Sequence, residues 1–339
     1  MPKRDKIQEE QEGSSNDHKK VKYDTNWNDM TKKIKEMIMT NMDFITRTSL
    51  KMCSKADKRL VEAFPMILKK LDAHHIVSLP YGNIHANKVA RLDLVDSQSN
   101  ADYDLRIVQH FDKNISLLRE GREIKNNWHI TKGEATKAME EYLYNILLTK
   151  NIQIKSFKTD WRINKKCIPK GHRFQFEKVF INGNGHKTGM SWLQHIAPGV
   201  KKITVEWEHY NKGIGDIPCV LEAEKLKINK SDINDEQLIK LKATQLFLHE
   251  ETSVTLDGIG KLIKKWKDED YPIGSHFMIY FQLHSKPLPE IQQFFDGMNV
   301  EFEMDGYKEN TIDMGPKKKM LIKVDSFEDF MTIGVTVKE

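Results

Sequence analysis

The residue types that most often carry chemistry in proteins are sparse in this chain of 339 residues. Its one glycine-rich turn, Asn182 to Gly189, reads Asn-Gly-Asn-Gly-His-Lys-Thr-Gly and is a candidate for a phosphate-binding loop. A P-loop requires glycine directly before Lys-Ser/Thr, and here His186 stands between them. Because glycine and asparagine also favour left-handed turn conformations, we interpret the segment as a turn between a strand and a helix.

Cysteine and histidine give no spacing that a metal site or a covalent mechanism would need. Cys53, Cys167 and Cys219 contain no Cys-x-x-Cys pair, and their odd number argues against a disulfide framework. His74 and His75 are adjacent, so their side chains point to different sides of whatever element holds them. No Gly-x-Ser-x-Gly elbow occurs, and Cys53 is expected on the inner face of a helical segment. The sequence therefore predicts a non-catalytic protein with no metal and no cofactor.

The net charge of +5 comes from one end of the chain. Residues 1–70 hold 16 Lys and Arg against 11 Asp and Glu, and the remainder holds 38 of each kind. This balance does not predict a broad basic face for nucleic acid. The N-terminus lacks the apolar run of a secretory signal, and no stretch approaches the ~20 apolar residues of a membrane span. We expect an intracellular protein, cytoplasmic or nuclear, without a nucleic-acid or membrane partner.

Three short helices are predicted between Trp27 and Pro65. Apolar residues at helical spacing mark the first of them, and these are Met30, Ile34, Met37 and Ile38. Asp43 is expected to cap the second helix, whose apolar positions are Ile45, Leu50, Met52 and Cys53. Ser54 opens the third helix, and Pro65 ends it. So small a module buries little apolar surface alone and usually needs a partner.

This segment resembles the F-box of nematode proteins, the module that docks substrate-recognition subunits on the Skp-type adaptor of cullin–RING ubiquitin ligases. The similar phrases are Met42-Asp43-Phe44, Ser49-Leu50-Lys51-Met52-Cys53-Ser54-Lys55 and Lys58-Arg59-Leu60-Val61. Met30-Thr31 stands where the family usually has Leu-Pro. Met can fill a Leu pocket, and Thr can cap a helix although it lacks the fixed φ of Pro. The resemblance implies an adaptor-binding surface of Trp27, Met30, Ile34, Met37, Ile38 and Leu50. The alternative is a helical subdomain that packs only on its own chain.

The sequence divides into four segments. Residues 1–25 are polar and predicted to be a disordered tail, and 26–65 form the F-box-like helical module. Residues 66–150 form a mixed connecting segment, with a strand from Asp104 to His110 and a helix from Ala135 to Leu148. Residues 151–339 form an α/β domain, so the fold class is mixed α+β and α/β.

A triplet of apolar residues recurs in this last domain with offsets of 24, 23 and 20 residues. Its four instances are Phe176/Val179/Ile181, Val200/Ile203/Val205, Ala223/Leu226/Ile228 and Ala243/Leu246/Leu248. A weaker copy, Ser275/Met278/Tyr280, follows. Such periods are typical of a leucine-rich-repeat-like solenoid, with one short strand in each repeat. We expect a mainly parallel, curved sheet lined by helices on one side.

The same domain resembles the F-box-associated domain of nematode F-box proteins. The similar phrases are Trp192 to Val200, Ile233 to Leu238, Leu246 to Leu248, Leu256 to Gly258 and Leu262 to Trp266. The two resemblances together imply a substrate-recognition subunit of a cullin–RING ubiquitin ligase, with the C-terminal domain holding a protein substrate. The alternative is a plain protein-interaction repeat domain whose degenerate F-box has no ligase role.

Strand alternation predicts which residues bind the substrate. The second and third positions of each triplet point to one face, toward the helices. The residues between them, Phe180, Thr204, Lys227 and Phe247, are then expected to line the opposite, concave face and to contact a protein partner.

Overall fold

The computed structural model describes residues 27–76, 86–97, 102–110, 115–119, 122–123, 135–160, 168–183, 186–207, 212–249, 253–282, 288–297, 307–327 and 330–339. The predicted disordered tail, residues 1–25, lies outside these ranges. The chain divides into two compact units, Met1–Asn41 and Met42–Glu339. Because the division falls at Asn41, the predicted helical module of residues 26–65 is shared between them.

The described part of the first unit is a short 3-10 helix, η1 (Trp27–Asp29), followed by α1 (Lys32–Asn41). Thr31 directly precedes α1 and caps its first turn. Its Oγ1 accepts a hydrogen bond from the backbone N–H of Ile34 at 3.4 Å. Two apolar side chains of α1 are exposed to solvent: Ile34 is 45 % exposed and Met37 is 59 % exposed.

The second unit begins with α2 (Phe44–Cys53) and α3 (Lys55–Ala63). Both predicted caps are present, because Asp43 accepts from the N–H of Thr46 and Ser54 from that of Asp57. Helix α3 ends at Ala63, two residues before Pro65, as predicted. The Asp43 carboxylate and the Ser54 hydroxyl satisfy N–H groups that have no partner within their helices.

The predicted apolar face of α2 is wrong in part. Ile45 packs against the core and Leu50 is half-buried, but the other two predicted residues are exposed. Phe44 and Arg47 are its buried residues, whereas Met52 is 70 % exposed. Cys53 is also exposed and does not lie on an inner face. Arg47 is held inside by hydrogen bonds from its guanidinium to the carbonyls of Met42 and Pro65. A buried arginine cannot be read from apolar periodicity, so the sequence does not show that Arg47 belongs to the inner face of α2 while Met52 and Cys53 do not.

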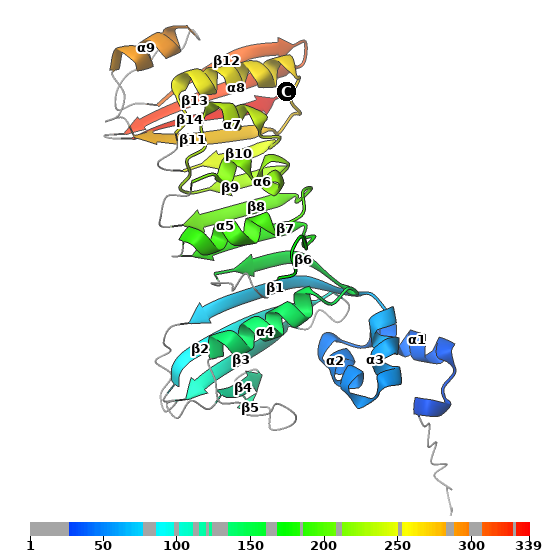
Figure 1. The fold of residues 1–339 in the computed structure, drawn as a ribbon. Helices are drawn as coiled ribbons and strands as arrows, with labels where there is room; N and C mark the ends of the chain where they lie inside the picture. Colours follow the sequence, from blue (N-terminus) through cyan, green and yellow to red (C-terminus); the bar gives the residue numbers. More distant parts are fainter. Residues whose placement is uncertain are drawn as a thin grey trace, which may run out of the picture. The chain divides into compact units, whose positions relative to one another are not determined.

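The strands of the described residues form one sheet, in the order β12-β13-β14-β11-β10-β9-β8-β7-β6-β1-β2-β3-β4-β5 (Figure 1). Their bounds are β1 (Met66–Ile76), β2 (Ala86–Asp96), β3 (Asp102–His110), β4 (Ile115–Arg119), β5 (Arg122–Glu123), β6 (Ile152–Thr159), β7 (Lys178–Gly183), β8 (Lys202–Trp207), β9 (Lys225–Ile228), β10 (Gln245–Leu248), β11 (His276–Gln282), β12 (Tyr307–Gly315), β13 (Lys318–Phe327) and β14 (Phe330–Lys338).

The centre of the sheet is parallel and both ends are antiparallel. Strands β1 and β6 to β11 pair in parallel. Strands β2 to β5 extend one end as antiparallel partners, and β14, β13 and β12 extend the other. The mixed α/β class is therefore confirmed, and the two antiparallel ends are additions that the triplet pattern did not predict. The connecting segment takes part in the central sheet, because β1 pairs with β6.

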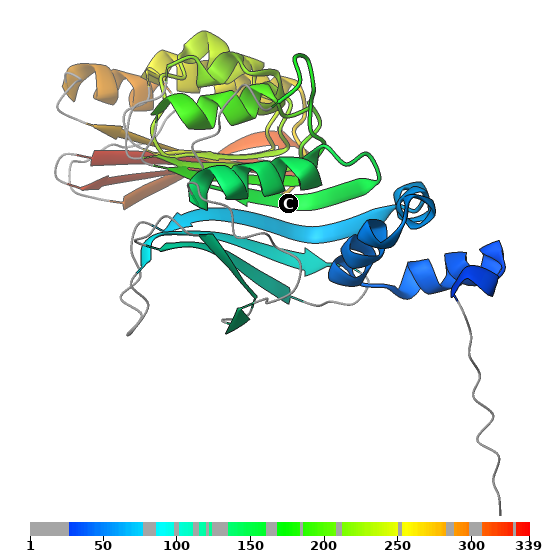
Figure 2. The same cartoon turned by 60° about the horizontal axis from the view of Figure 1, so that its bottom comes forward.

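The remaining helices are α4 (Ala135–Leu147), α5 (His186–Gln194), η3 (Ile214–Asp216), α6 (Pro218–Leu221), α7 (Asp235–Lys240), α8 (Leu256–Asp268) and α9 (Leu288–Asp296). Figure 2 shows the helices that connect the parallel strands on one face of the sheet. The order of the strands explains why these helices lie on one face. From β6 to β11 each new strand is added on the same side of the last, so right-handed crossovers place every connecting helix on the same face. The opposite face of these strands carries no helix among the described residues.

The predicted register of the triplets is confirmed. Val179, Ile203, Leu226 and Leu246 are cross-strand partners, as are Ile181, Val205, Ile228 and Leu248. All eight are buried. The weaker fifth copy is wrong by one residue, because Leu246 pairs with Phe277 and not with Met278. A shift of one residue moves a side chain to the other face of a sheet. That the repeats form a leucine-rich-repeat-like solenoid stays a prediction.

None of the helices in the described ranges is long and apolar enough to cross a membrane.

Candidate functional site

The candidate site is the helix-free face of the parallel strands, and three rows of side chains cross it. The central row follows the residues between the second and third triplet positions. It consists of Lys158, Phe180, Thr204, Lys227, Phe247 and Met278. The four residues predicted to bind the substrate therefore lie side by side in one register row.

The four predicted residues differ in accessibility. Phe180 is half-buried under the ammonium group of Lys158, which lies 4.7 Å from the ring centroid. Thr204 is only 6 % exposed between its row neighbours, so it cannot offer much surface to a partner. Lys227 is exposed and pairs with Glu206 at 2.9 Å. Phe247 is half-buried and stands edge-on to the ring of His276, 5.4 Å away.

The second row is basic and was not predicted. Lys178, Lys202 and Lys225 are direct partners on β7, β8 and β9. Lys178 and Lys202 are exposed and Lys225 is half-buried. No acidic side chain of the described residues forms an ion pair with any of them, whereas Lys201 nearby pairs with Glu177 at 3.6 Å. We call Lys178, Lys202 and Lys225 the lysine row.

A depression of about 600 Å³ opens at the lysine row. Lys178, Lys202, Lys225, Lys227 and Phe247 contribute to its lining, together with Lys201, Glu224, Gln245 and the strand residues Ile203 and Leu226. The lining thus combines several ammonium groups, one carboxylate that has no ion pair among the described residues, and one aromatic ring. Such a surface is suited to an anionic ligand that also carries an apolar group.

The third row lies two residues beyond the central row along each strand and includes His249 and Tyr280, which make the β10 and β11 end of the face aromatic. The rings of His249 and Tyr280 lie 4.3 Å apart, next to Phe247 and His276 in the other rows. Met278 adds a half-buried apolar side chain. The helix-free face therefore changes from basic over β7 to β9 to aromatic over β10 and β11.

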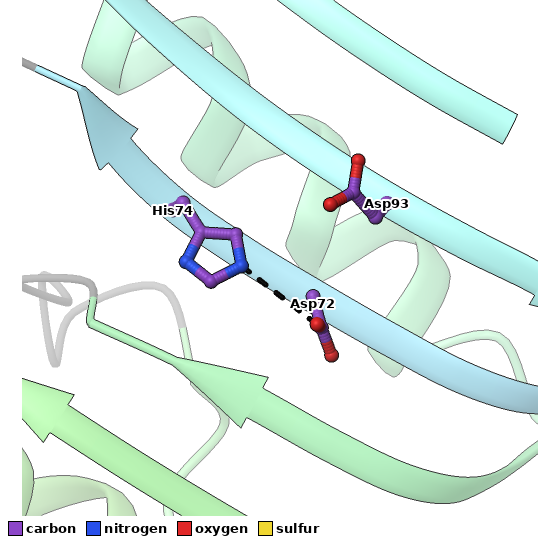
Figure 3. A group of neighbouring side chains, drawn as sticks. All are labelled: Asp72, His74 and Asp93. Atoms are coloured by element: carbon purple, nitrogen blue, oxygen red, sulfur yellow. Dashed lines mark ion pairs between the residues drawn. The ribbon is translucent and has the colours of Figure 1, made fainter.

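A separate group of titratable side chains lies on β1 and β2, on the same side of the sheet as the helix-free face. One oxygen of Asp72, one of Asp93 and a ring nitrogen of His74 all lie within 4.8 Å of one another (Figure 3). Asp72 and His74 share a face because they are two apart in a strand, and Asp93 is the direct partner of Asp72. The sequence does not predict this group, because the apolar spacing of residues 66–76 does not indicate a strand.

This group is better explained as an ion-pair network than as a metal site. Lys70 Nζ lies 2.7 Å from Asp72 Oδ2, and Arg91 Nε lies 2.8 Å from Asp93 Oδ1. A divalent metal would have to compete with these cations for the same oxygens. Burial acts to raise the pKa of the Asp72 carboxyl, but interactions with His74 and Lys70 outweigh burial and hold that pKa below its ordinary value. Asp72 is only 3 % exposed, and its other oxygen has no hydrogen-bond partner among the described residues.

The residues predicted to bind the Skp-type adaptor fall in both units. In the first unit, Ile34 and Met37 are exposed, while Trp27, Met30 and Ile38 are half-buried. The ammonium group of Lys35 lies 5.6 Å from the Trp27 ring centroid. In the second unit, the sixth predicted residue, Leu50, is half-buried in α2.

Residues 135–282 match the model of a protein family described as a domain of unknown function, DUF3557. The matched stretch runs from α4 to β11, so it includes the lysine row and most of the parallel sheet. No curated protein and no solved structure matches the chain.

Proposed function

We propose that this protein is a non-catalytic substrate adaptor of a cullin–RING ubiquitin ligase. Its N-terminal helices would dock on a Skp-type adaptor, and its C-terminal sheet would hold a protein substrate. Binding both partners raises the effective concentration of substrate lysines near the ubiquitin carrier, so the adaptor itself needs no catalytic group.

The observation that carries the proposal is the exposed apolar side of α1. Ile34 and Met37 are one turn apart, and about half of each side chain is open to solvent. Apolar side chains in a row on a helix are a common means of docking in a groove of a partner. The sequence phrases that resemble an F-box continue into α2 and α3, and the caps at Asp43 and Ser54 fit the same three-helix pattern.

The test is co-purification of the full chain with a Skp-type adaptor protein, compared between two variants. Ile34→Asp places a charge in the proposed apolar interface and should abolish the complex. Lys32→Asp is the control. Residues two positions apart in a helix differ by about 200° around its axis, so Lys32 faces away from Ile34. The Lys32 side chain is 86 % exposed, so its replacement should leave the complex intact.

Circular dichroism should show that both variants are folded. Unchanged adaptor binding by the Ile34→Asp variant would contradict the docking surface. If the wild-type chain binds no Skp-type adaptor, the protein instead acts as an interaction domain without a ligase role.

A further inference from the structure

We propose that the lysine row and the depression beside it bind an acidic peptide segment of the substrate. This deepens the proposed function and rests on it, because it names the chemical class of the bound protein. The ligand would present carboxylate or phosphate groups to Lys178, Lys202 and Lys225, and an apolar side chain to Phe247.

The argument begins with the energetics of the lysine row. Like charges directly opposite each other on neighbouring strands destabilise a sheet, and here three lysines on three successive strands are direct partners. The lysines around the row are neutralised in other ways: Lys227 by Glu206 and Lys201 by Glu177. The row itself has no ion-pairing carboxylate among the described residues, and a bound polyanion would remove its repulsion.

The spacing of the row favours an extended chain over a single small anion. Neighbouring strands are about 4.8 Å apart, so three successive strands span about 10 Å. One phosphate carries at most two negative charges, so it cannot neutralise all three ammonium groups of the row. Two acidic side chains on the same side of an extended peptide lie about 6.8 Å apart, so both fit within the length of the row.

The surroundings of the row favour a peptide over a nucleic acid. A continuous phosphate backbone is longer than the row and would also pass the carboxylates of Glu177, Glu206 and Glu224 beside it, whereas a short acidic segment ends within the row. Residues 71–339 carry equal numbers of basic and acidic residues, so no long-range field attracts a polyanion of high charge density. A short acidic segment needs only the three local charges, and Phe247 supplies an adjacent apolar contact.

The test uses the purified full chain and fluorescence anisotropy with labelled peptides. One peptide carries alternating Asp and Glu around a central Leu, and the second replaces every acid by Asn or Gln. A third peptide carries phosphoserine in place of the acidic residues, so comparing it with the first shows whether the row prefers phosphate or carboxylate groups. We expect the charged peptides to bind at least about tenfold more tightly than the neutral one, with an affinity that falls as salt screens the charges.

The decisive variant is the triple substitution Lys178→Gln, Lys202→Gln and Lys225→Gln. It should weaken binding of the charged peptides about tenfold or more, while the melting temperature stays equal or rises because repulsion in the row is relieved. The matched control replaces three exposed lysines of α7 and α8, Lys240, Lys264 and Lys267, by Gln. It removes the same charge from the helical face and should leave binding unchanged.

Three results would overturn the proposal. The first is equal binding of the acidic and neutral peptides, and the second is equal binding of the acidic peptide by the wild type and the lysine-row variant. The third is a single-stranded oligonucleotide that binds more tightly than any peptide and loses that binding in the same variant. The peptide assay contains no ligase component, so a negative result in it does not contradict binding to the Skp-type adaptor. Likewise, failure to co-purify with the adaptor does not contradict binding of the acidic peptide.

Discussion

At the scale of single residues, Leu246 and Phe247 are neighbours in β10 with opposite surroundings. Leu246 is 1 % exposed and packs in the core beneath the helices. Phe247 lies on the helix-free face beside the depression. Leu246→Ala should lower the free energy of unfolding by roughly 2–5 kcal/mol, as cavities in a protein core do. Phe247→Ala should change stability less and weaken binding of the acidic peptide, because it removes the apolar contact.

Urea denaturation and peptide anisotropy, measured on both variants, test this pair. The assignment of faces would be contradicted by a Phe247→Ala variant that binds the peptide normally and loses more stability than Leu246→Ala.

We expect the free energy of unfolding to depend on pH through the Asp72 carboxyl. Its pKa in the folded protein is lowered, so its contribution is present above the unfolded pKa and is lost as pH falls through the folded pKa. Asp72→Asn should therefore cost about 1 kcal/mol at about pH 6 and progressively less toward about pH 3. Urea denaturation at several pH values measures the difference. Asp313→Asn, an exposed residue of β12, is the control, and a cost for Asp72→Asn that does not vary with pH would refute the assignment.

The lysine row shows why some of the site escaped prediction. Its members recur at offsets of 24 and 23 residues, the same offsets as the first apolar triplets. The sequence therefore contains the signal, but the charge balance of residues 71–339 hides it, because 38 basic residues cancel 38 acidic ones. By contrast, Phe180 and Phe247 could be placed correctly because alternation in a strand fixes the face of every residue once the triplets are aligned.

At the scale of elements, hydrogen bonds join the N-terminal ends of α7 and α8. Asp235, the first residue of α7, accepts hydrogen bonds from Thr255 N at 2.7 Å and from Thr255 Oγ1 at 2.6 Å. Thr255 in turn caps α8 by accepting from the N–H of Gly258 at 3.2 Å. A Cβ on Gly258 would overlap the Asp235 carboxylate. The glycine is thus required by the close approach of the two helices.

Gly258→Ala should therefore lower the free energy of unfolding by about 1–3 kcal/mol, as overpacking does. This is the reverse of the usual preference of a helix interior for alanine over glycine, which is about 1 kcal/mol. Gly260→Ala in the same helix is the control. Its Cβ would meet only the ring edge of Phe294 at 3.3 Å, so the loss should be smaller. Thermal unfolding compares the two, and a stabilised Gly258→Ala variant would refute the proposed contact.

The helices were predicted better than the outer strands, and β1 shows the reason. Its register shifts between Leu68 and Lys70, so the buried residues Leu68 and Leu71 are three apart. In sequence this spacing is typical of a helix and not of a strand. Capped helices such as α7 carry a local signal, Asn234 with Gln237, that needs no knowledge of distant partners. Strand pairing between distant segments leaves no such mark.

At the scale of the whole molecule, the parallel sheet depends on strands at both of its ends. Strand β1 covers one edge of β6, with Leu71 opposite Phe157. Strand β14 covers the outer edge of β11, with Ile333 opposite Ile279. All four of these side chains are buried. Neither covering strand belongs to the stretch of residues 135–282 that matches the DUF3557 model.

A fragment of residues 135–282 should therefore be much less stable than residues 42–339. Removing β1 and β14 leaves the backbone groups of β6 and β11 unpaired at two open edges, and exposed edges promote association between copies. It also uncovers apolar side chains, among them Phe157 and Ile279, that are buried in the full sheet. We expect the fragment to unfold at a lower temperature or to aggregate, as measured by circular dichroism and size-exclusion chromatography. A monomeric fragment that melts cooperatively at the temperature of residues 42–339 would show that the matched stretch is an independent domain and that the antiparallel ends do not stabilise it.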